Sequence, residues 1–150
     1  MQLGFVGVGA MGVPIVSHLV AAGHTVNAYD LSADALAKAQ AAGAHAAGSV
    51  GQAAAGAQVV FVAVSSQDVL GEVLRQPGGI LECAAPGAIV VDLGTTAPPR
   101  CRAFAADARA VGMDYVDAPL SGSTPWAQAG TLAVMVGAEQ AAWDLSLIHI

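Results

Sequence analysis

The chain has 150 residues, which is the length of one domain and enough to bury a core without disulfides or metal ions. Five basic residues against eleven acidic ones give a net charge of −6. This balance leaves no basic patch for nucleic-acid phosphates and no basic amphipathic helix for a membrane surface, so we expect a small-molecule partner.

The hydrophobic content is 55%, yet alanine supplies much of it and the later apolar runs are only as long as buried strands. Glycines interrupt residues 3–22 and no basic segment precedes them, so we expect neither a signal peptide nor a transmembrane helix there. Cys83 and Cys101 form no disulfide or CxxC pattern, which fits a reducing cytoplasm.

The first thirty residues have the pattern of a dinucleotide-binding βαβ unit. An apolar strand leads into GVGAMG at residues 7–12, followed by a helical segment and a second apolar strand at 25–30. In such a loop Gly7 makes the tight turn, Gly9 lets backbone approach a pyrophosphate, and Gly12 allows close packing of helix on sheet. The helix N-terminus would hold the pyrophosphate through its unpaired N–H groups and its dipole.

Asp30 ends the second strand, where a Rossmann unit carries the carboxylate that accepts hydrogen bonds from the adenine ribose. This position favours NAD. A 2′-phosphate would meet a like charge there, and Leu31 follows in place of a neutralising arginine, so NADP is disfavoured. The same segment also fits a capping role, with Ser32 as the N-cap of the next helix, and both roles are compatible.

Strand and helix patterns alternate along the rest of the chain. We therefore predict an α/β fold of Rossmann type, with a doubly wound, mostly parallel sheet. Gly23 and Gly43 suit left-handed C-caps after the first two helices. The expected later elements are a short connection at 44–48, a brief helix capped by Ser49, a buried strand at 58–64, a helix from Ser66 to about Leu74, a Gly-rich loop, a strand at 87–92, a helix from Pro98 to about Val111, and strands at 113–117 and 130–137.

The turn at residues 65–68 follows the buried strand at 58–64. Ligands of open α/β sheets bind outside the carboxyl ends of the strands, so this turn should border the cofactor. Its side chains fit equally well a simpler role, in which Ser66 caps the next helix.

Three segments occur in order along the chain: GFVGVGAMG at 4–12, DLGTTAPP at 92–99, and DAPLSGSTPWAQAGTLAVMVG at 117–137. Together they resemble the β-hydroxyacid dehydrogenase family, which includes 3-hydroxyisobutyrate dehydrogenase and tartronate semialdehyde reductase. The resemblance covers roughly residues 1–144. It implies an NAD(P)-dependent, metal-independent oxidation of a hydroxyl group β to a carboxylate, with hydride passing to or from the nicotinamide.

The resemblance also implies site residues. Three elements of the family have counterparts in this chain: the phosphate loop, the turn after the fourth strand, and the threonine on the nicotinamide side. Together with Asp30, they give the expected cofactor-binding residues Gly7, Val8, Gly9, Ala10, Met11, Gly12, Asp30, Val64, Ser65 and Thr95. The family's Ser-Gly-Gly element falls on Ser121, Gly122 and Ser123, which would hold a substrate carboxylate through backbone N–H groups and a hydroxyl. Ser121 is the expected catalytic residue, in a substrate-positioning role.

Four residues depart from the family pattern. Ser123 replaces a glycine, so a positive φ there would be costly and the carboxylate pocket reshaped. Gly94, Pro125 and Trp126 replace smaller or hydroxylated residues. Trp126 fits equally well a lid packed on a neighbouring domain and a direct substrate contact.

Family members carry their acid/base lysine in an all-helical C-terminal domain, which these 150 residues lack. Lys38, the one lysine, is expected on the adenine side, too far from Ser121 to protonate a carbonyl. The histidines at 18, 24, 45 and 149 show no metal-ligand spacing. Residues 145–150 stop matching the family, so we expect a Rossmann domain at 1–144 and a tail produced by truncation.

The leading hypothesis is therefore the cofactor-binding half of an NAD(P)-dependent 3-hydroxyacid dehydrogenase that uses NAD. We expect this half alone to bind dinucleotide weakly and to turn over no substrate. The full-length protein would be a cytoplasmic homo-oligomer. Two alternatives stay open: a stand-alone dinucleotide-binding module without catalysis, and an imine reductase-like enzyme, a class that lacks the DAPxSG element.

Overall fold

The structure is a computed structural model, and it describes residues 1–140, 142 and 143. The expected tail at 145–150 lies outside the described residues. The strands are β1 (Gln2–Val6), β2 (Thr25–Tyr29), β3 (His45–Ala46), β4 (Val59–Val62), β5 (Ile89–Asp92), β6 (Asp114–Asp117), β7 (Leu120–Ser121) and β8 (Ala133–Val134). The helices are α1 (Gly12–Ala21), α2 (Ala33–Ala41), α3 (Val50–Ala54), α4 (Gln67–Arg75), α5 (Ile80–Cys83), α6 (Pro98–Ala110) and α7 (Thr124–Ala129).

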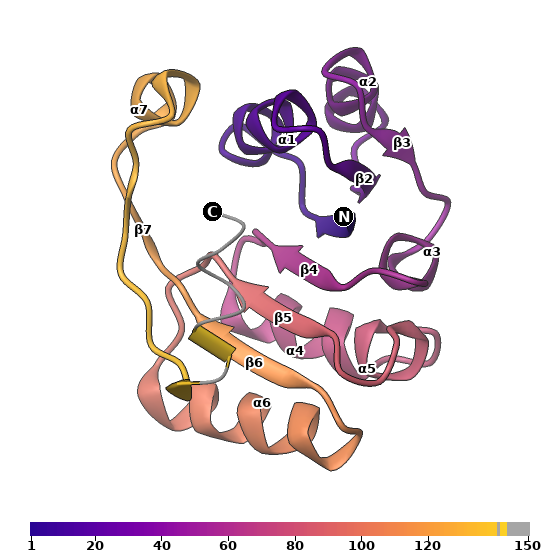
Figure 1. Cartoon of the computed structure of the whole chain (residues 1–150), viewed down its shortest axis with the longest axis vertical. Coiled ribbons are helices and arrows are strands. Elements are labelled where there is room, and N and C mark those ends of the chain that lie inside the picture. The colour runs from indigo at the N-terminus through magenta and orange to yellow at the C-terminus, as the bar shows by residue number, and fades with distance from the viewer. Residues whose placement is uncertain (141, 144–150) are drawn as a thin grey trace.

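The six-stranded sheet has the order β3-β2-β1-β4-β5-β6, and every neighbouring pair in it is parallel (Figure 1). The chain runs outward from β1 to β3 and then returns to place β4 on the other side of β1. The order therefore reverses between β1 and β4, and this is the point where open α/β sheets bind ligands at the carboxyl ends of their strands. The predicted fold class, a Rossmann-type doubly wound sheet, is confirmed.

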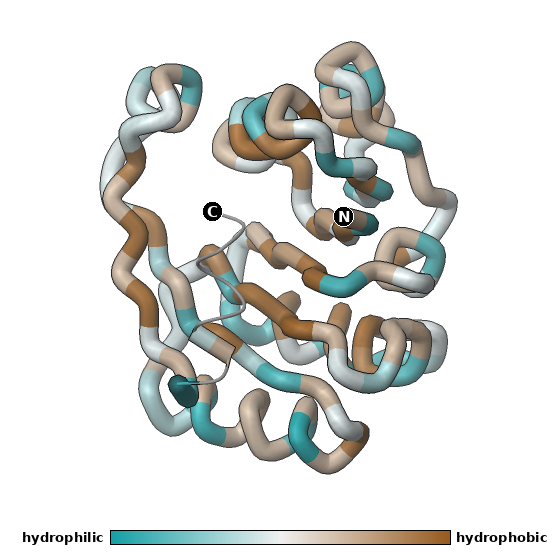
Figure 2. The backbone as a smooth tube through the Cα atoms, in the orientation of Figure 1, coloured by the Kyte–Doolittle hydropathy of each residue, from teal (hydrophilic) through white to brown (hydrophobic). Residues whose placement is uncertain are grey.

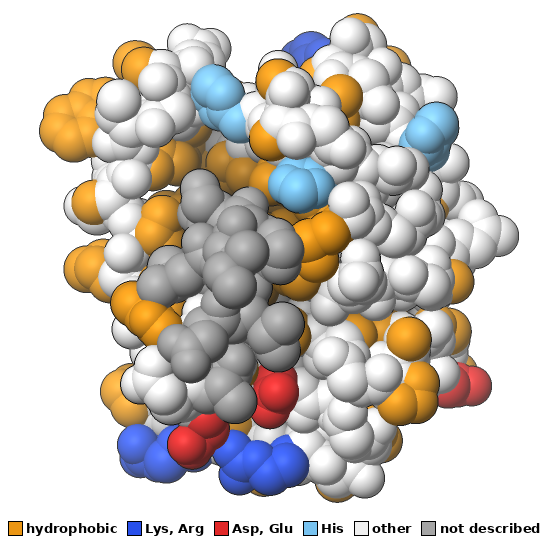
Figure 3. All heavy atoms as spheres, viewed as in Figure 1, with side chains coloured by type: hydrophobic (Ala, Val, Ile, Leu, Met, Phe, Trp, Pro, Cys, Tyr) orange, Lys and Arg blue, Asp and Glu red, His pale blue; other side chains and the backbone are white. Residues whose placement is uncertain are grey.

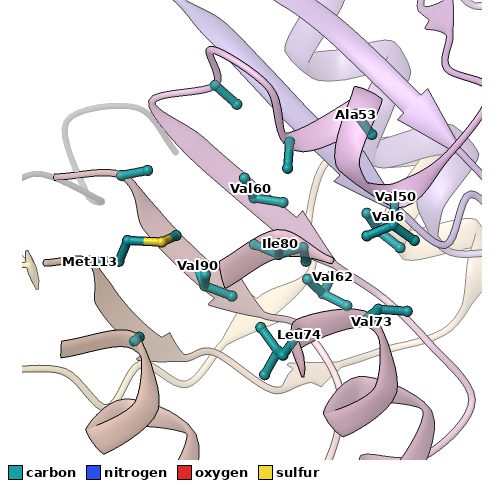
Figure 4. Close-up of a cluster of buried hydrophobic side chains, with 14 of the residues drawn as sticks. Val6, Val50, Ala53, Val60, Val62, Val73, Leu74, Ile80, Val90 and Met113 are labelled. Atoms are coloured by element: carbon teal, nitrogen blue, oxygen red, sulfur yellow. The ribbon is translucent and has the colours of Figure 1, made fainter. Parts of the chain in front are cut away.

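Both faces of the central strands are buried, which explains why these strands are apolar throughout rather than alternating. Along β4, Val60 and Val62 face the cluster that packs under α3 to α6, whereas Val59 and Phe61 face the cluster under α1 and α2. Figure 4 shows the first cluster, with Ile80 and Leu74 lying over the strands. Figure 2 shows the same apolar bands along β4 and β5.

The long elements lie where the sequence predicts them. Ser32 and Ser66 cap α2 and α4, each accepting a hydrogen bond from the N–H group three residues on. Gly23 and Gly43 follow α1 and α2 with φ of 87° and 98°, as expected for left-handed C-caps. Pro98 begins α6, where the missing N–H group costs no helical hydrogen bond.

The short elements differ from the expectation. The connection at 44–48 contains β3, which extends the sheet beyond β2, and the Gly-rich loop contains α5. The predicted strand at 130–137 is wrong in its extent, because only β8 forms a ladder, with β7, and Gly137 makes a separate bridge to Asp117. Such elements are too short to show a periodic pattern in the sequence.

Residues 118–137 form an arm built from β7, α7 and β8 that stands at the edge of the main sheet (Figure 1). The arm is tied to α1, because His18 Nε2 lies 3.1 Å from both the Ala127 and the Gln128 carbonyl oxygens. Among residues 1–140, 142 and 143, no helix has the length and apolar character needed to cross a membrane.

Candidate cofactor site

The glycine loop connects β1 to α1 at the switch point of the sheet. Gly7 has φ of 92°, and a side chain there would collide with the Ala63 carbonyl at the end of β4. A side chain at Gly12 would collide with the Gly7 carbonyl, so this glycine lets α1 pack closely on β1. Gly9, by contrast, faces open space. Two of the glycines are therefore required by the fold, and the third leaves room for a ligand.

The first turn of α1 faces the same space. Met11 is the N-cap residue and makes no side-chain capping bond, so no side chain occupies the N–H groups of this turn. The positive end of the helix dipole and these N–H groups together suit a phosphate group.

Asp30 lies just after β2 and is held by two backbone groups. Its Oδ2 accepts a hydrogen bond of 2.8 Å from the Val8 N–H, and its Oδ1 accepts one of 2.8 Å from the Ser32 N–H. An ionised carboxylate offers about four acceptor positions, so both oxygens keep capacity for ribose hydroxyls. The capping role of Ser32 is confirmed, and the ribose role of Asp30 stays a prediction that is compatible with it.

A cavity of about 460 Å³ lies along the glycine loop, between the ends of β1, β2 and β4. It brings together most of the expected cofactor residues: Gly7, Gly9, Ala10, Met11, Gly12, Asp30, Val64 and Ser65. Val64 and Ser65 also line a second cavity, of about 280 Å³, together with Thr95. The two cavities share these residues and so adjoin, between Asp30 and the turn after β5. Val8 lines a further depression beside α2.

The carboxyl end of β5 carries a buried acid. Asp92 is only 1% exposed and accepts hydrogen bonds from the Gly94 N–H, the Thr96 hydroxyl and the Tyr115 hydroxyl. Burial and the neighbouring Asp92 charge raise the pKa of Tyr115, so it stays a protonated donor. No role is predicted for Asp92 from the sequence, although an acid that ends an otherwise apolar strand is a signal for one.

Asp117 lies beside Asp92 in the register of β5 and β6. Burial raises the pKa of the Asp117 carboxyl, the Asp92 charge raises it further, and a hydrogen bond with Cys101 lowers it. Asp117 Oδ1 is buried without a hydrogen-bond partner among the described residues. The pKa of Cys101 is also raised, by burial first and then by the two acids. This thiol is therefore a poor nucleophile.

The expected substrate element lies on the arm, and it lines neither of the two cavities. Ser121 ends β7 and is exposed, and Gly122 has φ of 133°. Ser123 has φ of −117° and ψ of 178°, which any residue adopts. The condition for a costly conformation at Ser123 is therefore not met, because the positive φ falls on Gly122. The Thr124 hydroxyl lies 4.0 Å from Met11 Sδ and joins this element to the glycine loop.

The arm also carries exposed apolar side chains, visible along its outer edge in Figure 3. Trp126 is 56% exposed and Met135 is 55% exposed. Trp126 therefore has room for either role considered above, a lid or a substrate contact.

Lys38 lies on α2 and lines the depression beside the glycine loop together with Val8 and Gln128. His18 is engaged with α7, and His24 Nδ1 lies 3.3 Å from the amino group of Met1. His149 lies outside the described residues. Within residues 1–140, 142 and 143, no group of three or more His, Cys, Asp or Glu side chains could hold a metal ion.

The fold, the glycine loop and the carboxylate after β2 define a dinucleotide-binding Rossmann domain. A sequence profile of the NAD-binding domain of 6-phosphogluconate dehydrogenase matches residues 2–147. The chain belongs to this family of NAD-binding domains.

Relatives with curated names support the resemblance to the β-hydroxyacid dehydrogenases. The chain is 38% identical to 2-(hydroxymethyl)glutarate dehydrogenase from Eubacterium barkeri over 144 residues, 96% of this chain and 48% of the relative. It is 42% identical to NAD-dependent L-serine dehydrogenase from Pseudomonas aeruginosa over 143 residues, 95% of this chain and 48% of the relative. The chain thus spans about half the length of these relatives.

Solved structures of other proteins share the fold of this chain. Mycobacterium tuberculosis 3-hydroxyisobutyrate dehydrogenase with L-serine matches with a TM-score of 0.93 at 32% identity, over 98% of this chain and 50% of that one. A Streptomyces aurantiacus imine reductase matches with a TM-score of 0.87 at 21% identity, over 99% of this chain and 51% of that one. The second likeness shows only the shared fold. The predicted family is confirmed, and the imine reductase alternative gains no support beyond the fold.

Proposed function

We propose that this chain is the cofactor-binding part of an NAD-dependent oxidoreductase that acts on a β-hydroxyacid or the corresponding semialdehyde. The observation that carries the proposal is a pair of adjoining cavities, one lined by Asp30 and the glycine loop and the other by Thr95. A dinucleotide is a long ligand whose two halves need separate contacts, and each cavity offers contacts to one half.

The residues fit each part of the cofactor. Asp30 would accept hydrogen bonds from the adenine ribose, and its charge disfavours a 2′-phosphate, so NAD is favoured over NADP. The glycine loop and the first turn of α1 would hold the pyrophosphate. Thr95 and the turn at Val64 and Ser65 would border the nicotinamide end. When bound, NAD would supply the hydride acceptor.

The substrate assignment rests on the arm. Ser121, Gly122 and Ser123 match the family's carboxylate-binding element, and Thr124 contacts Met11 of the glycine loop. This contact supports a substrate site next to the cofactor. Names of relatives support a small hydroxyl-bearing acid, since one relative is an L-serine dehydrogenase and another acts on 2-(hydroxymethyl)glutarate.

Proton transfer needs a base near the substrate hydroxyl. Lys38 lies on α2, beside the outer side of the glycine loop rather than on the arm. We therefore assign the base to a lysine beyond the Rossmann domain, as the family resemblance implies, and the Rossmann domain to residues 1–144. We further propose a cytoplasmic homo-oligomer for the whole protein.

The proposal is tested by titrating the purified 150-residue chain with NADH and NADPH while following nicotinamide fluorescence. We expect weak saturable binding with preference for NADH, and no NAD reduction with L-serine or 3-hydroxyisobutyrate. Absence of binding to either dinucleotide contradicts the proposed function. Turnover by this chain alone would instead contradict the assignment of proton transfer to an outside lysine, and binding without turnover by the full-length protein would favour a dinucleotide-binding module.

A further inference from the structure

We propose that Asp92 is a positioning residue, whose buried carboxylate fixes the turn after β5 so that Thr95 faces the nicotinamide end of the cofactor site. The inference rests on the proposed function, because it concerns the same site. It assigns a role to a buried side chain that lines the same cavity as Thr95.

Asp92 bonds to the residues on both sides of Thr95. Its Oδ1 accepts the Gly94 N–H at 2.9 Å, and its Oδ2 accepts the Thr96 hydroxyl at 2.6 Å. One side chain therefore fixes the backbone before Thr95 and the side chain after it. Thr95 itself is exposed, and within the described part of the chain its hydroxyl makes no hydrogen bond. It is left available to a ligand in the cavity that it lines with Ser65.

The carboxylate is in turn held in place from β6. The Tyr115 hydroxyl donates to Asp92 Oδ2 at 2.7 Å, and Tyr115 is itself buried on the neighbouring strand. Three donors thus converge on a side chain that is 1% exposed. Burying a carboxylate is costly, and these donors offset the cost only if the turn keeps its present shape.

Gly94 is part of the same arrangement. A Cβ atom at this position would lie 3.1 Å from Asp92 Oδ1, which is tighter than ordinary contact. The absence of a side chain lets the backbone N–H reach the carboxylate. The departure from the family pattern at Gly94 therefore accompanies a close approach between the turn and the buried acid.

The far end of the turn is held independently by α4. The Ala97 N–H donates to Gln67 Oε1 at 3.2 Å, and Arg100 Nη2 donates to the Gln67 carbonyl and to Asp68 Oδ1 at 3.2 and 2.6 Å. Two of these three contacts are exposed, so solvent weakens them. The Asp92 contacts are partly or fully buried and should dominate the position of Thr95.

The test compares two ligands that differ only at the nicotinamide end. NADH would extend through both cavities, whereas ADP-ribose keeps the adenosine, the pyrophosphate and the second ribose but lacks the nicotinamide ring. Dissociation constants for both are measured by calorimetry on the 150-residue chain, for the parent and for Asp92→Ala, Asp92→Asn and Thr96→Val. The matched control is Asp114→Asn, which changes the same residue type at the opposite end of the neighbouring strand.

We expect Asp92→Ala to weaken NADH binding about tenfold or more while ADP-ribose binding changes less than about twofold. Asp92→Asn should recover part of the loss, because its amide oxygen can still accept the Gly94 N–H. Thr96→Val removes one of the hydroxyl donors to Asp92 while keeping the shape of the side chain. It replaces Asp92→Ala as the test variant if Asp92→Ala does not fold. Asp114→Asn should leave both constants unchanged.

Equal losses for the two ligands would mean that Asp92 has only a structural role, and unchanged NADH binding in Asp92→Ala and Thr96→Val would also overturn the inference. A parent chain that binds ADP-ribose as tightly as NADH would contradict the inference alone. A parent chain that binds neither ligand would contradict the proposed function itself.

Discussion

The Val8 N–H group donates a hydrogen bond of 2.8 Å to Asp30 Oδ2, and this contact joins the glycine loop to the end of β2. The two residues follow β1 and β2, which are neighbouring parallel strands of the sheet. The carboxylate that would bind the ribose is therefore held by the same loop that would bind the pyrophosphate. A change at Asp30 should affect both parts of the cofactor site.

Replacing Asp30 with alanine should weaken NADH binding by about tenfold or more, because hydrogen bonds to a charged acceptor are lost. The preference for NADH over NADPH should also narrow, since no negative charge opposes the 2′-phosphate. Fluorescence titration with the two dinucleotides measures both effects. Asp34→Ala, an exposed acid in the first turn of α2, is the control. A parent chain that prefers NADPH would refute this role for Asp30.

Substitutions at Gly9 and Gly12 should have different effects, the first on dinucleotide binding and the second on the stability of the fold. Gly9→Ala adds a methyl group in open space, so the melting temperature should stay nearly constant while dinucleotide binding weakens. Gly12→Ala forces a methyl group against the Gly7 carbonyl and should destabilise the fold by about 1–3 kcal/mol. Thermal unfolding and NADH titration of the two variants test the pair. A large loss of stability in Gly9→Ala would contradict the open space at that position.

Asp117→Asn should change how stability depends on pH. An unfolded aspartate ionises near pH 4, about its reference value, whereas burial and the Asp92 charge keep folded Asp117 protonated to higher pH. The folded state then binds more protons, so this group lowers stability as pH rises from the unfolded pKa through the folded one. The free energy of unfolding of Asp117→Asn relative to the parent should therefore increase as pH rises from the unfolded pKa through the folded one. Urea unfolding from pH 4 to pH 7 measures it, with Asp114→Asn as control. A difference in unfolding free energy between Asp117→Asn and the parent that does not change with pH would contradict the raised pKa of Asp117.

In the expected carboxylate element, exchanging glycine and a larger residue should destabilise the fold at both Gly122 and Ser123, for different reasons. Gly122→Ala places a side chain at φ of 133° and against Leu132 and Trp126, so it should cost about 1–3 kcal/mol. Ser123→Gly relieves no strain, because Ser123 is extended, and should cost about 0.4–1 kcal/mol through the unfolded chain. The melting temperatures of Gly122→Ala and Ser123→Gly, compared with that of the parent, measure both effects. A gain in stability for Ser123→Gly would restore the idea of strain at this residue.

The pattern of the sequence was sufficient for the alternating α/β order and for the family. Runs such as 58–64 are apolar throughout because both faces of β4 are covered, and GVGAMG has a local backbone requirement that sequence alone displays. By contrast, β3, α5 and α7 are too short for periodicity to reveal them. Each is stabilised mainly by neighbours that are distant in the sequence, such as His18 against α7.

For the candidate site, local sequence is sufficient to predict the separate parts: a glycine loop suited to phosphate, an acid after β2, and a turn after β5 that carries Thr95. Which side chains contact one another across the sheet depends on the folded arrangement. Tyr115 meets Asp92 because the register of β5 and β6 places a hydroxyl from one strand beside a carboxylate on the other, whereas Thr96 reaches Asp92 from the following turn. A hydrogen bond depends on distance and direction between side chains, and strand register sets both only once the sheet has formed.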